Sequence, residues 1–437
     1  MTLRGLAVLF TLGLALPLFT SAFTSAFADD SKPLKELLVE KGVITAEEAA
    51  TTQEAVFARW IDRIVFYGDL RVRHSSFFFD NNGNGTFNNG VDEHRERFRL
   101  RIGTDITIGD LMVGIRVASG TGQQTSTNQT ENDLFNGKGI WIDRAFMSWQ
   151  GANSRWLTLT AGKMANPFFT IHSSDLVWDE DVNPEGFAEN FTSSPAEHVH
   201  LFFNAGQFVL NEVAVNNHDP WLLGEQGGVS VEPSPLVKVT VAAAFYDAVN
   251  ASGRDSNALN GTVQQGNSRF NASCTAAPPA NSCYLLNNFR ILDLTALVNL
   301  QAGPIPIALM GDYVRNLANT TTTGAASGQA TGNEGYHIGA IVGEAAEAHS
   351  WEVAYFYKLL QLDATLADLA DSDFGTGGTA RRGHIIWAAY NPTPYLQFKT
   401  RYFTTKSIPF APGYATATPW GNAGDVNHLQ VDVTVKF

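Results

Sequence analysis

The sequence has little of what would identify a metalloprotein. Its 437 residues contain only two cysteines, Cys274 and Cys283, both in one polar stretch. Two cysteines cannot build a structural zinc site, and this pair does not form the Cys-x-x-Cys-His of an attached haem. In an exported protein such a pair predicts a single loop-closing disulfide, Cys274–Cys283.

Charge is also scarce, and acids prevail. Only 16% of the residues are charged, with 29 Lys and Arg against 43 Asp and Glu, so the formal net charge is −14. This balance disfavours nucleic acid as a partner. The chain further lacks a Gly-x-Ser-x-Gly elbow, a His-Glu-x-x-His pair and a phosphate-binding Gly loop, and we expect no enzyme activity.

Long apolar runs are confined to the N-terminus. Arg4 precedes an apolar core at 6–19, and Ala26-Phe27-Ala28 stands before Asp29, which predicts a signal peptide over residues 1–28 rather than an uncleaved anchor. No later segment reaches the roughly 18 apolar residues that a membrane helix needs. Residues 29–62 differ from both neighbours. Leucines at helical spacing and a Thr45/Glu48 capping box predict a short helical periplasmic segment, either a spacer or a contact with the cell wall or another subunit.

The chain is rich in stretches in which polar and apolar residues alternate with a period of two. Arginine occupies the odd positions of 95–101, and apolar residues occupy the even positions of 98–108, so the two sets lie on opposite faces of a strand. After a turn at Gly109-Asp110 the apolar face recurs at the odd positions of 111–117, with Arg116 opposite. A soluble sandwich could use one such hairpin, and a solenoid or propeller would need a fixed-period repeat, which the sequence lacks.

The whole of 63–437 repeats this pattern. We expect about 16 strands, at 63–78, 94–108, 111–119, 139–150, 155–164, 196–205, 207–217, 227–233, 236–248, 287–302, 304–317, 334–345, 349–362, 380–391, 394–406 and 425–437. Short turns, for example at Ala205-Gly206, alternate with long polar segments, which a soluble sandwich has no reason to do. The sequence therefore predicts an all-β fold, a transmembrane antiparallel β-barrel over 63–437, whose last strand pairs with the first.

Two short stretches and the C-terminus add a resemblance. Phe66-Tyr67-Gly68-Asp69-Leu70-Arg71, the run 157–163 and the terminal Phe437 resemble bacterial outer-membrane porins built like the general trimeric porins. The resemblance implies a homotrimer in the lipid and lipopolysaccharide of the outer membrane, through which small hydrophilic solutes and ions diffuse. Two departures stand out: general porins lack the helical piece before the barrel, and their Pro-Glu-Phe-Gly-Gly loop sequence is missing here.

In that family the third loop folds into the pore and narrows it, and the matching segment here is 165–195. We expect its acids to face a ladder of arginines across the lumen and to set a field there. The acids are Asp175, Asp179, Glu180, Asp181, Glu185 and Glu189; the arginines are Arg71, Arg73, Arg95, Arg97, Arg99, Arg101 and Arg116. Alternatively, the acids lie outside, solvated or bound to divalent ions between lipopolysaccharides.

Some interpretations stay open. The channel could be selective for one substrate or for anions. The barrel could instead surround a partner electron-transfer protein. An outer-membrane hydrolase would need a Ser/His pair on the barrel wall, and no residue spacing in the sequence indicates one. Asp80, Asn82 and Asn84 match the start of a calcium loop, but its twelfth position is Val91 rather than Glu. A plain Asn/Gly loop tip is therefore favoured, and Ca²⁺ is the only cofactor considered.

Overall fold

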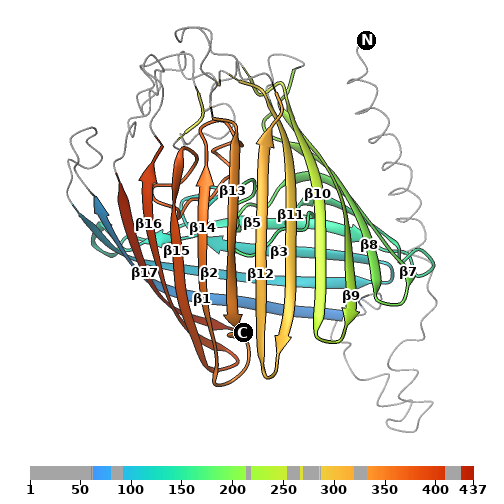
Figure 1. Cartoon of the computed structure of the whole chain (residues 1–437), viewed down its shortest axis with the longest axis horizontal. Coiled ribbons are helices and arrows are strands. Elements are labelled where there is room, and N and C mark those ends of the chain that lie inside the picture. The colour runs from blue at the N-terminus through green and yellow to red at the C-terminus, as the bar shows by residue number, and fades with distance from the viewer. Residues whose placement is uncertain are drawn as a thin grey trace, which may run out of the picture.

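The computed structural model describes residues 61, 63–79, 92–212, 218–252, 266–268, 285, 287–318, 332–408 and 425–437. These residues form one antiparallel sheet that closes on itself as a barrel (Figure 1). No helix in these ranges is long and apolar enough to cross a membrane. The predicted signal peptide, the helical segment except residue 61, the calcium-loop residues Asp80, Asn82 and Asn84, and the Cys274–Cys283 pair lie outside the described residues.

The sheet has seventeen strands, of which β4 (Gln129–Thr130) is only two residues long. The first half contains β1 (Arg63–Phe79), β2 (Glu93–Ile108), β3 (Leu111–Ser119), β5 (Ile140–Trp149), β6 (Leu157–Lys163), β7 (Glu185–Ala196), β8 (Val199–Val209) and β9 (Trp221–Ser234). The second half contains β10 (Val237–Val249), β11 (Phe289–Ala302), β12 (Ile305–Asn316), β13 (Glu334–Gly343), β14 (Ser350–Leu360), β15 (Arg381–Thr393), β16 (Leu396–Ser407) and β17 (Val426–Lys436). A 3-10 turn, η2 (Asp133–Phe135), lies between β4 and β5. Without β4 the barrel has sixteen strands, which confirms the predicted number.

The barrel closes where the last strand meets the first. β17 pairs antiparallel with β1, from Asp69 opposite Lys436 to Phe79 opposite Val426. The backbones of Gly68 and Phe437 exchange two hydrogen bonds of 2.8 and 3.0 Å. A Cβ atom at Gly68 would lie 2.7 Å from the Phe437 ring, so glycine makes room for the terminal aromatic. Closure leaves no open strand edge, which lipid could not satisfy.

Alternation along each strand divides the outside from the inside. On β1, Leu70 and Val72 are 42% and 48% exposed, whereas Arg71 and Arg73 between and beside them are buried within the barrel. On the neighbouring strands, Ile102 and Ile115 are likewise exposed while Arg99 and Arg116 are buried. Apolar side chains thus cover the outer surface and guanidinium groups point inward, as a membrane barrel with a polar lumen requires.

Two predicted strands were wrong. Instead of strands at 196–205 and 207–217, the chain forms β7, which begins eleven residues earlier, and β8, which begins eight residues earlier, joined by a turn at Glu197-His198. His198 adopts a φ of +63°, a conformation that Ala205-Gly206 was expected to supply. Gly206 lies inside β8, where a Cβ atom would lie 2.5 Å from the Phe208 ring and 3.2 Å from the Phe168 ring of the third loop. The third loop therefore ends at residue 184 rather than 195, and Glu185 and Glu189 belong to β7.

Candidate functional site

Arginines line one wall of the barrel interior. The seven predicted from the sequence lie on β1 (Arg71, Arg73), β2 (Arg95, Arg97, Arg99, Arg101) and β3 (Arg116). The cross-strand register places Arg71 opposite Arg99 and Arg73 opposite Arg97. Sequence reasoning missed three further cations of the wall, Arg144 on β5 and Lys399 and Arg401 on β16. Alternation along β16 could have placed Lys399 and Arg401 on the inner face, whereas Arg144 lies at a register shift between β3 and β5 that alternation does not reveal.

Strand carboxylates neutralise part of this wall. Asp69 on β1 accepts hydrogen bonds from Nε of Arg99 at 3.0 Å and from Nε of Arg101 at 2.7 Å. Asp432 on β17 binds Arg73 at two points, with distances of 2.7 and 2.9 Å. Arg116 pairs with Asp143 on β5. The two-point contact of Arg73 with Asp432 fixes the orientation of that guanidinium group more firmly than a single hydrogen bond would.

The third loop, residues 164–184, folds into the barrel and packs on the inner face of β8–β10. The Phe168 ring contacts Trp178, Phe208 and Tyr246, with ring centroids 5.1 to 6.2 Å apart. Gln226 on β9 receives the amide of Phe169 at 2.7 Å and donates to its carbonyl at 2.8 Å. These contacts bury the apolar side of the loop and turn its other side toward the arginine wall.

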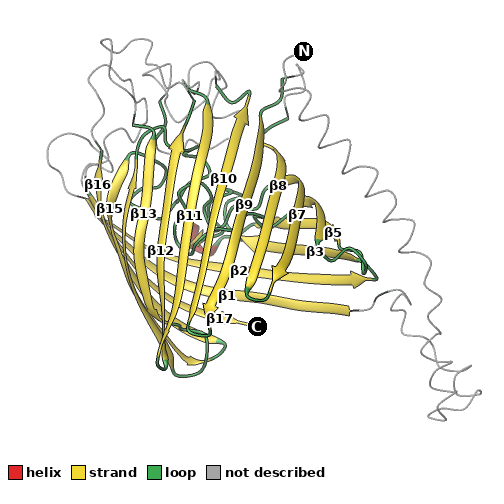
Figure 2. Cartoon of the chain, turned by 45° about the vertical axis from the view of Figure 1, so that its right-hand side comes forward, coloured by secondary structure: helices red, strands yellow, loops and turns green. Residues whose placement is uncertain are grey.

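A second segment, 361–380 between β14 and β15, also folds inward, which the sequence did not predict. Figure 2 shows loop segments in green inside the ring of strands. Leu369 O accepts the amide of Asp179 at 2.7 Å, and the amide of Ser372 donates to the Asp179 carboxylate at 2.8 Å. Lys358 on β14 binds Asp371 of this second segment at 2.7 Å, and both side chains are buried. The two inward segments therefore form one packed unit across part of the lumen.

The predicted loop acids differ in their surroundings. Asp175 and Asp179 lie at the contact between the two inward segments, where burial first and neighbouring carboxylates second raise the pKa of each well above its usual range. Asp181 reaches the arginine wall, 3.5 Å from Arg101, and accepts from the Thr127 amide and hydroxyl at 3.2 and 3.1 Å. Glu185 starts β7 instead of lying in the loop, and pairs with Lys163 at 2.7 Å.

Glu180 alone among them has an exposed side chain in the loop. Enclosure by the barrel raises its pKa, but Arg401, His172 and Arg99 outweigh that effect and lower the pKa to about 2. The neighbouring His172 has a pKa lowered to about 4 by burial and by Lys399. At neutral pH the loop therefore presents the exposed Glu180 carboxylate and an uncharged imidazole to the basic wall, in addition to Asp181, which is paired with Arg101.

The wall has more guanidinium groups than partners. Arg71 donates to Asn128 at 2.6 Å and Arg144 to Asn183 at 2.7 Å, both neutral amides. Among the described residues, neither Arg97 nor Arg401 makes an ion pair, and the Nε of Arg97 is buried without a hydrogen-bond partner. Four cations of the wall thus have no carboxylate partner among the described residues, and Glu180 is the predicted acid that is exposed within the third loop.

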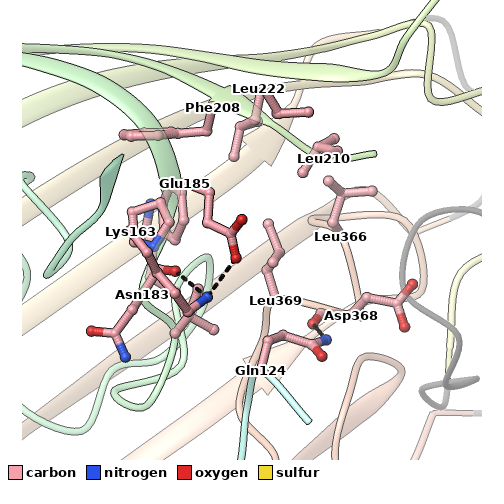
Figure 3. A pocket seen from close by; sticks show the side chains of 14 residues that line it. Gln124, Lys163, Asn183, Glu185, Phe208, Leu210, Leu222, Leu366, Asp368 and Leu369 are labelled. Atoms are coloured by element: carbon pink, nitrogen blue, oxygen red, sulfur yellow. Dashed lines mark hydrogen bonds and ion pairs between the residues drawn. The ribbon is translucent and has the colours of Figure 1, made fainter. Parts of the chain in front are cut away.

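A cavity of about 190 Å³ lies between the third loop, β8, β9 and the 361–380 segment (Figure 3). Apolar side chains such as Phe208, Leu222 and Leu369 form its floor, and the Lys163–Glu185 pair stands at one edge. In the described ranges no three His, Cys, Asp or Glu side chains are grouped so that they could hold a metal ion.

Comparison with known proteins adds the following findings. The family model described as "Putative porin" matches residues 84–437. Among solved structures, OmpF of Salmonella typhi in complex with daunomycin is 12% identical, covers 86% of this chain and 97% of its own, and has a TM-score of 0.49. An anion-selective porin from Comamonas acidovorans is 11% identical, with coverage of 86% and 99% and a TM-score of 0.45. No curated protein sequence matches the chain.

Proposed function

The chain belongs to this porin family, and from that premise we propose that it forms a water-filled channel for passive diffusion of small hydrophilic solutes and ions across the bacterial outer membrane. The observation that carries the proposal is the closed sixteen-strand barrel with apolar residues outside and guanidinium groups inside. Such a surface is stable in lipid, and such a lumen is stable only in contact with water or with counter-charges.

The passage is narrowed by the arginine wall and by the two inward segments. In this proposal Arg71, Arg97, Arg144 and Arg401 face the solute path, while Glu180 projects from the loop opposite them. The ion pairs of Asp69, Asp181 and Asp432 support the proposal, because they fix neighbouring arginines without cancelling the charge of these four. Charged groups that line a narrow passage act strongly on ions that have lost part of their hydration.

A preference for anions is the second candidate, and one observation favours it. Four lumen cations lack a carboxylate partner within the described residues, against one exposed and ionised loop acid. An anion entering the lumen would supply the missing counter-charge. A cation would meet uncompensated guanidinium groups and would be repelled.

We further propose that the protein works as a homotrimer surrounded by outer-membrane lipid and lipopolysaccharide. Exposed apolar side chains on the outer face, including Val72, Ile115 and Phe203, support contact with lipid or with other copies. Light scattering corrected for detergent should give the mass of three copies; the mass of one copy would contradict the trimer.

Solute uptake by proteoliposomes tests the proposed function. Vesicles that contain the protein should swell in isotonic solutions of small sugars, faster for monosaccharides than for trisaccharides. Vesicles with the heat-denatured protein are the control. Equal rates with native and denatured protein would contradict a diffusion channel.

A further inference from the structure

Asp373 of the 361–380 segment is bound by the strands through both its carboxylate and its backbone carbonyl. Oδ2 of Asp373 lies 3.0 Å from Arg73 on β1, and the backbone carbonyl of Asp373 accepts from Nδ1 of His428 on β17 at 3.1 Å. Burial raises the pKa of Asp373, but Arg73, His428 and Arg401 hold it well below its usual range. Asp373 therefore remains an anion throughout the physiological pH range.

The segment that carries Asp373 is fixed independently of this contact. Oδ1 of Asp371 accepts the amides of Asp373 at 2.8 Å and Phe374 at 3.1 Å, while its Oδ2 binds Lys358. Phe374 is 1% exposed and packs on Phe403. The side chain of Asp373 can thus leave its partners by rotation while the backbone of the segment stays in place.

The wall around Asp373 has more donors than Asp373 can use. Arg97 is the cross-strand neighbour of Arg73 and makes no ion pair among the described residues. In the adjacent row, Arg401, Gln430 and Ser75 are neighbours on β16, β17 and β1. Ser75 is fully buried, and its hydroxyl has no hydrogen-bond partner. Buried polar groups are almost always hydrogen-bonded, so unused donors beside unpaired guanidinium groups indicate a site for an anionic ligand.

We propose that Arg73, Arg97, Arg401, Ser75 and Gln430 form a binding site for oxyanions, carboxylates or phosphates, which Asp373 occupies as a tethered internal ligand. Planar guanidinium groups bind both kinds of oxyanion through paired N–H donors. A solute anion that arrives from the lumen exchanges with Asp373. The tethered carboxylate weakens the binding of the solute, and weak binding lets a solute leave as well as enter. This inference rests on the proposed channel function and names the class of solute for it.

Calorimetric titration of the purified full chain in detergent tests the site directly. Phosphate and succinate are titrated separately into the wild type, D373N, R97Q/D373N and E185Q. D373N should bind at least one of them about tenfold more tightly than the wild type, since a charged competitor has been removed. R97Q/D373N should lose that gain. E185Q, which removes a carboxylate held by Lys163 instead, should stay within about twofold of the wild type.

The outcomes separate the site from the channel. If D373N and D373A both bind phosphate and succinate as the wild type does, the oxyanion site is wrong. If D373N binds only one of the two anions more tightly than the wild type does, the result supports the site. That anion then identifies the ligand as phosphate or carboxylate. If D373N tightens as expected while proteoliposomes take up no solute, the site stands and the channel function fails.

Discussion

Neighbouring arginines on one strand face can have different roles, as Arg97 and Arg99 on β2 illustrate. Arg99 is clamped by Asp69 and lies 3.9 Å from Asp181, whereas Arg97 makes no ion pair with a described residue. Alternation in the sequence was sufficient to place both on one face. It could not distinguish them, because their partners come from β1 and from the third loop, distant in the sequence. Which arginines remain uncompensated is thus a property of the folded chain.

The substitution Arg97→Glu should shift the selectivity of the channel toward cations. The change replaces an uncompensated positive charge by a negative one. A unit charge about 4 Å from a passing ion is worth about 1 kcal/mol in water, so the anion-to-cation permeability ratio should fall by about fivefold or more. The measurement is the reversal potential in a salt gradient. Arg382→Glu, on the exposed side of β15, is the matched control, and equal potentials for both variants would contradict a role of Arg97 in the lumen.

Glu180 should stay ionised, and keep its effect on ion selectivity, at pH values far below neutral. The pKa of Glu180 falls from 4.5 to about 2, so its ionised form stabilises the fold above about pH 4.5, and this stabilisation is lost as the pH falls through about 2. Glu180→Gln should raise the anion-to-cation permeability ratio at pH 7. The difference from the wild type should persist at pH 4, because Glu180 stays ionised there. A difference that disappears by pH 4 would show that Glu180 does not face Arg401.

At the scale of elements, the sequence predicted fourteen of the sixteen long strands near their places and failed at β7 and β8. The failure had a physical cause: Gly206 resembles a turn residue, yet within β8 its missing side chain leaves room for the ring of Phe208 and for Phe168 of the third loop. The inward course of 361–380 was also missed. Its aspartates and glycines suggest an external loop, yet Leu362 and Leu366 are buried. The inward course depends on Lys358, Asp371 and Phe374 meeting partners from distant strands.

Gly224→Ala should loosen the third loop. A Cβ atom at this position of β9 would lie 2.5 Å from the Phe168 ring and 2.9 Å from Tyr246, and both rings are buried. We expect a loss of about 1–3 kcal/mol in the free energy of unfolding, as for other overpacked sites, and faster cleavage of the loop by protease. Gly227→Ala on the same strand meets nothing within 4 Å and should be neutral or stabilising. The account of the loop anchor is wrong if the two variants behave alike.

Lys358→Met should release the 361–380 segment. The substitution leaves Asp371 buried without its cation, which in other proteins costs about 3–5 kcal/mol. Denaturant unfolding should show this loss, and the conductance of the channel should rise because the segment no longer narrows the lumen. The double variant K358M/D371N removes both charges and should regain most of the stability. Unchanged stability of Lys358→Met would contradict the anchoring role of the pair.

At the scale of the whole molecule, closure of the barrel follows from the two ends of the described sheet. β1 and β17 pair over eleven residue positions, and Phe437 hydrogen-bonds Gly68. The sequence predicted this pairing because a chain that ends within a strand cannot leave an open edge in lipid. What it could not predict is how much of the lumen the loops fill, since the course of each loop depends on contacts with strands that are distant in the sequence. The open path through the lumen is therefore the property that most requires measurement.

Single-channel recording in a planar lipid bilayer measures that path directly. The purified protein, added to one side in symmetrical potassium chloride, should produce discrete current steps that rise linearly with voltage. In a salt gradient the reversal potential should have the sign of anion preference. Bilayers that retain their bare resistance after the folded protein has inserted would contradict a water-filled channel.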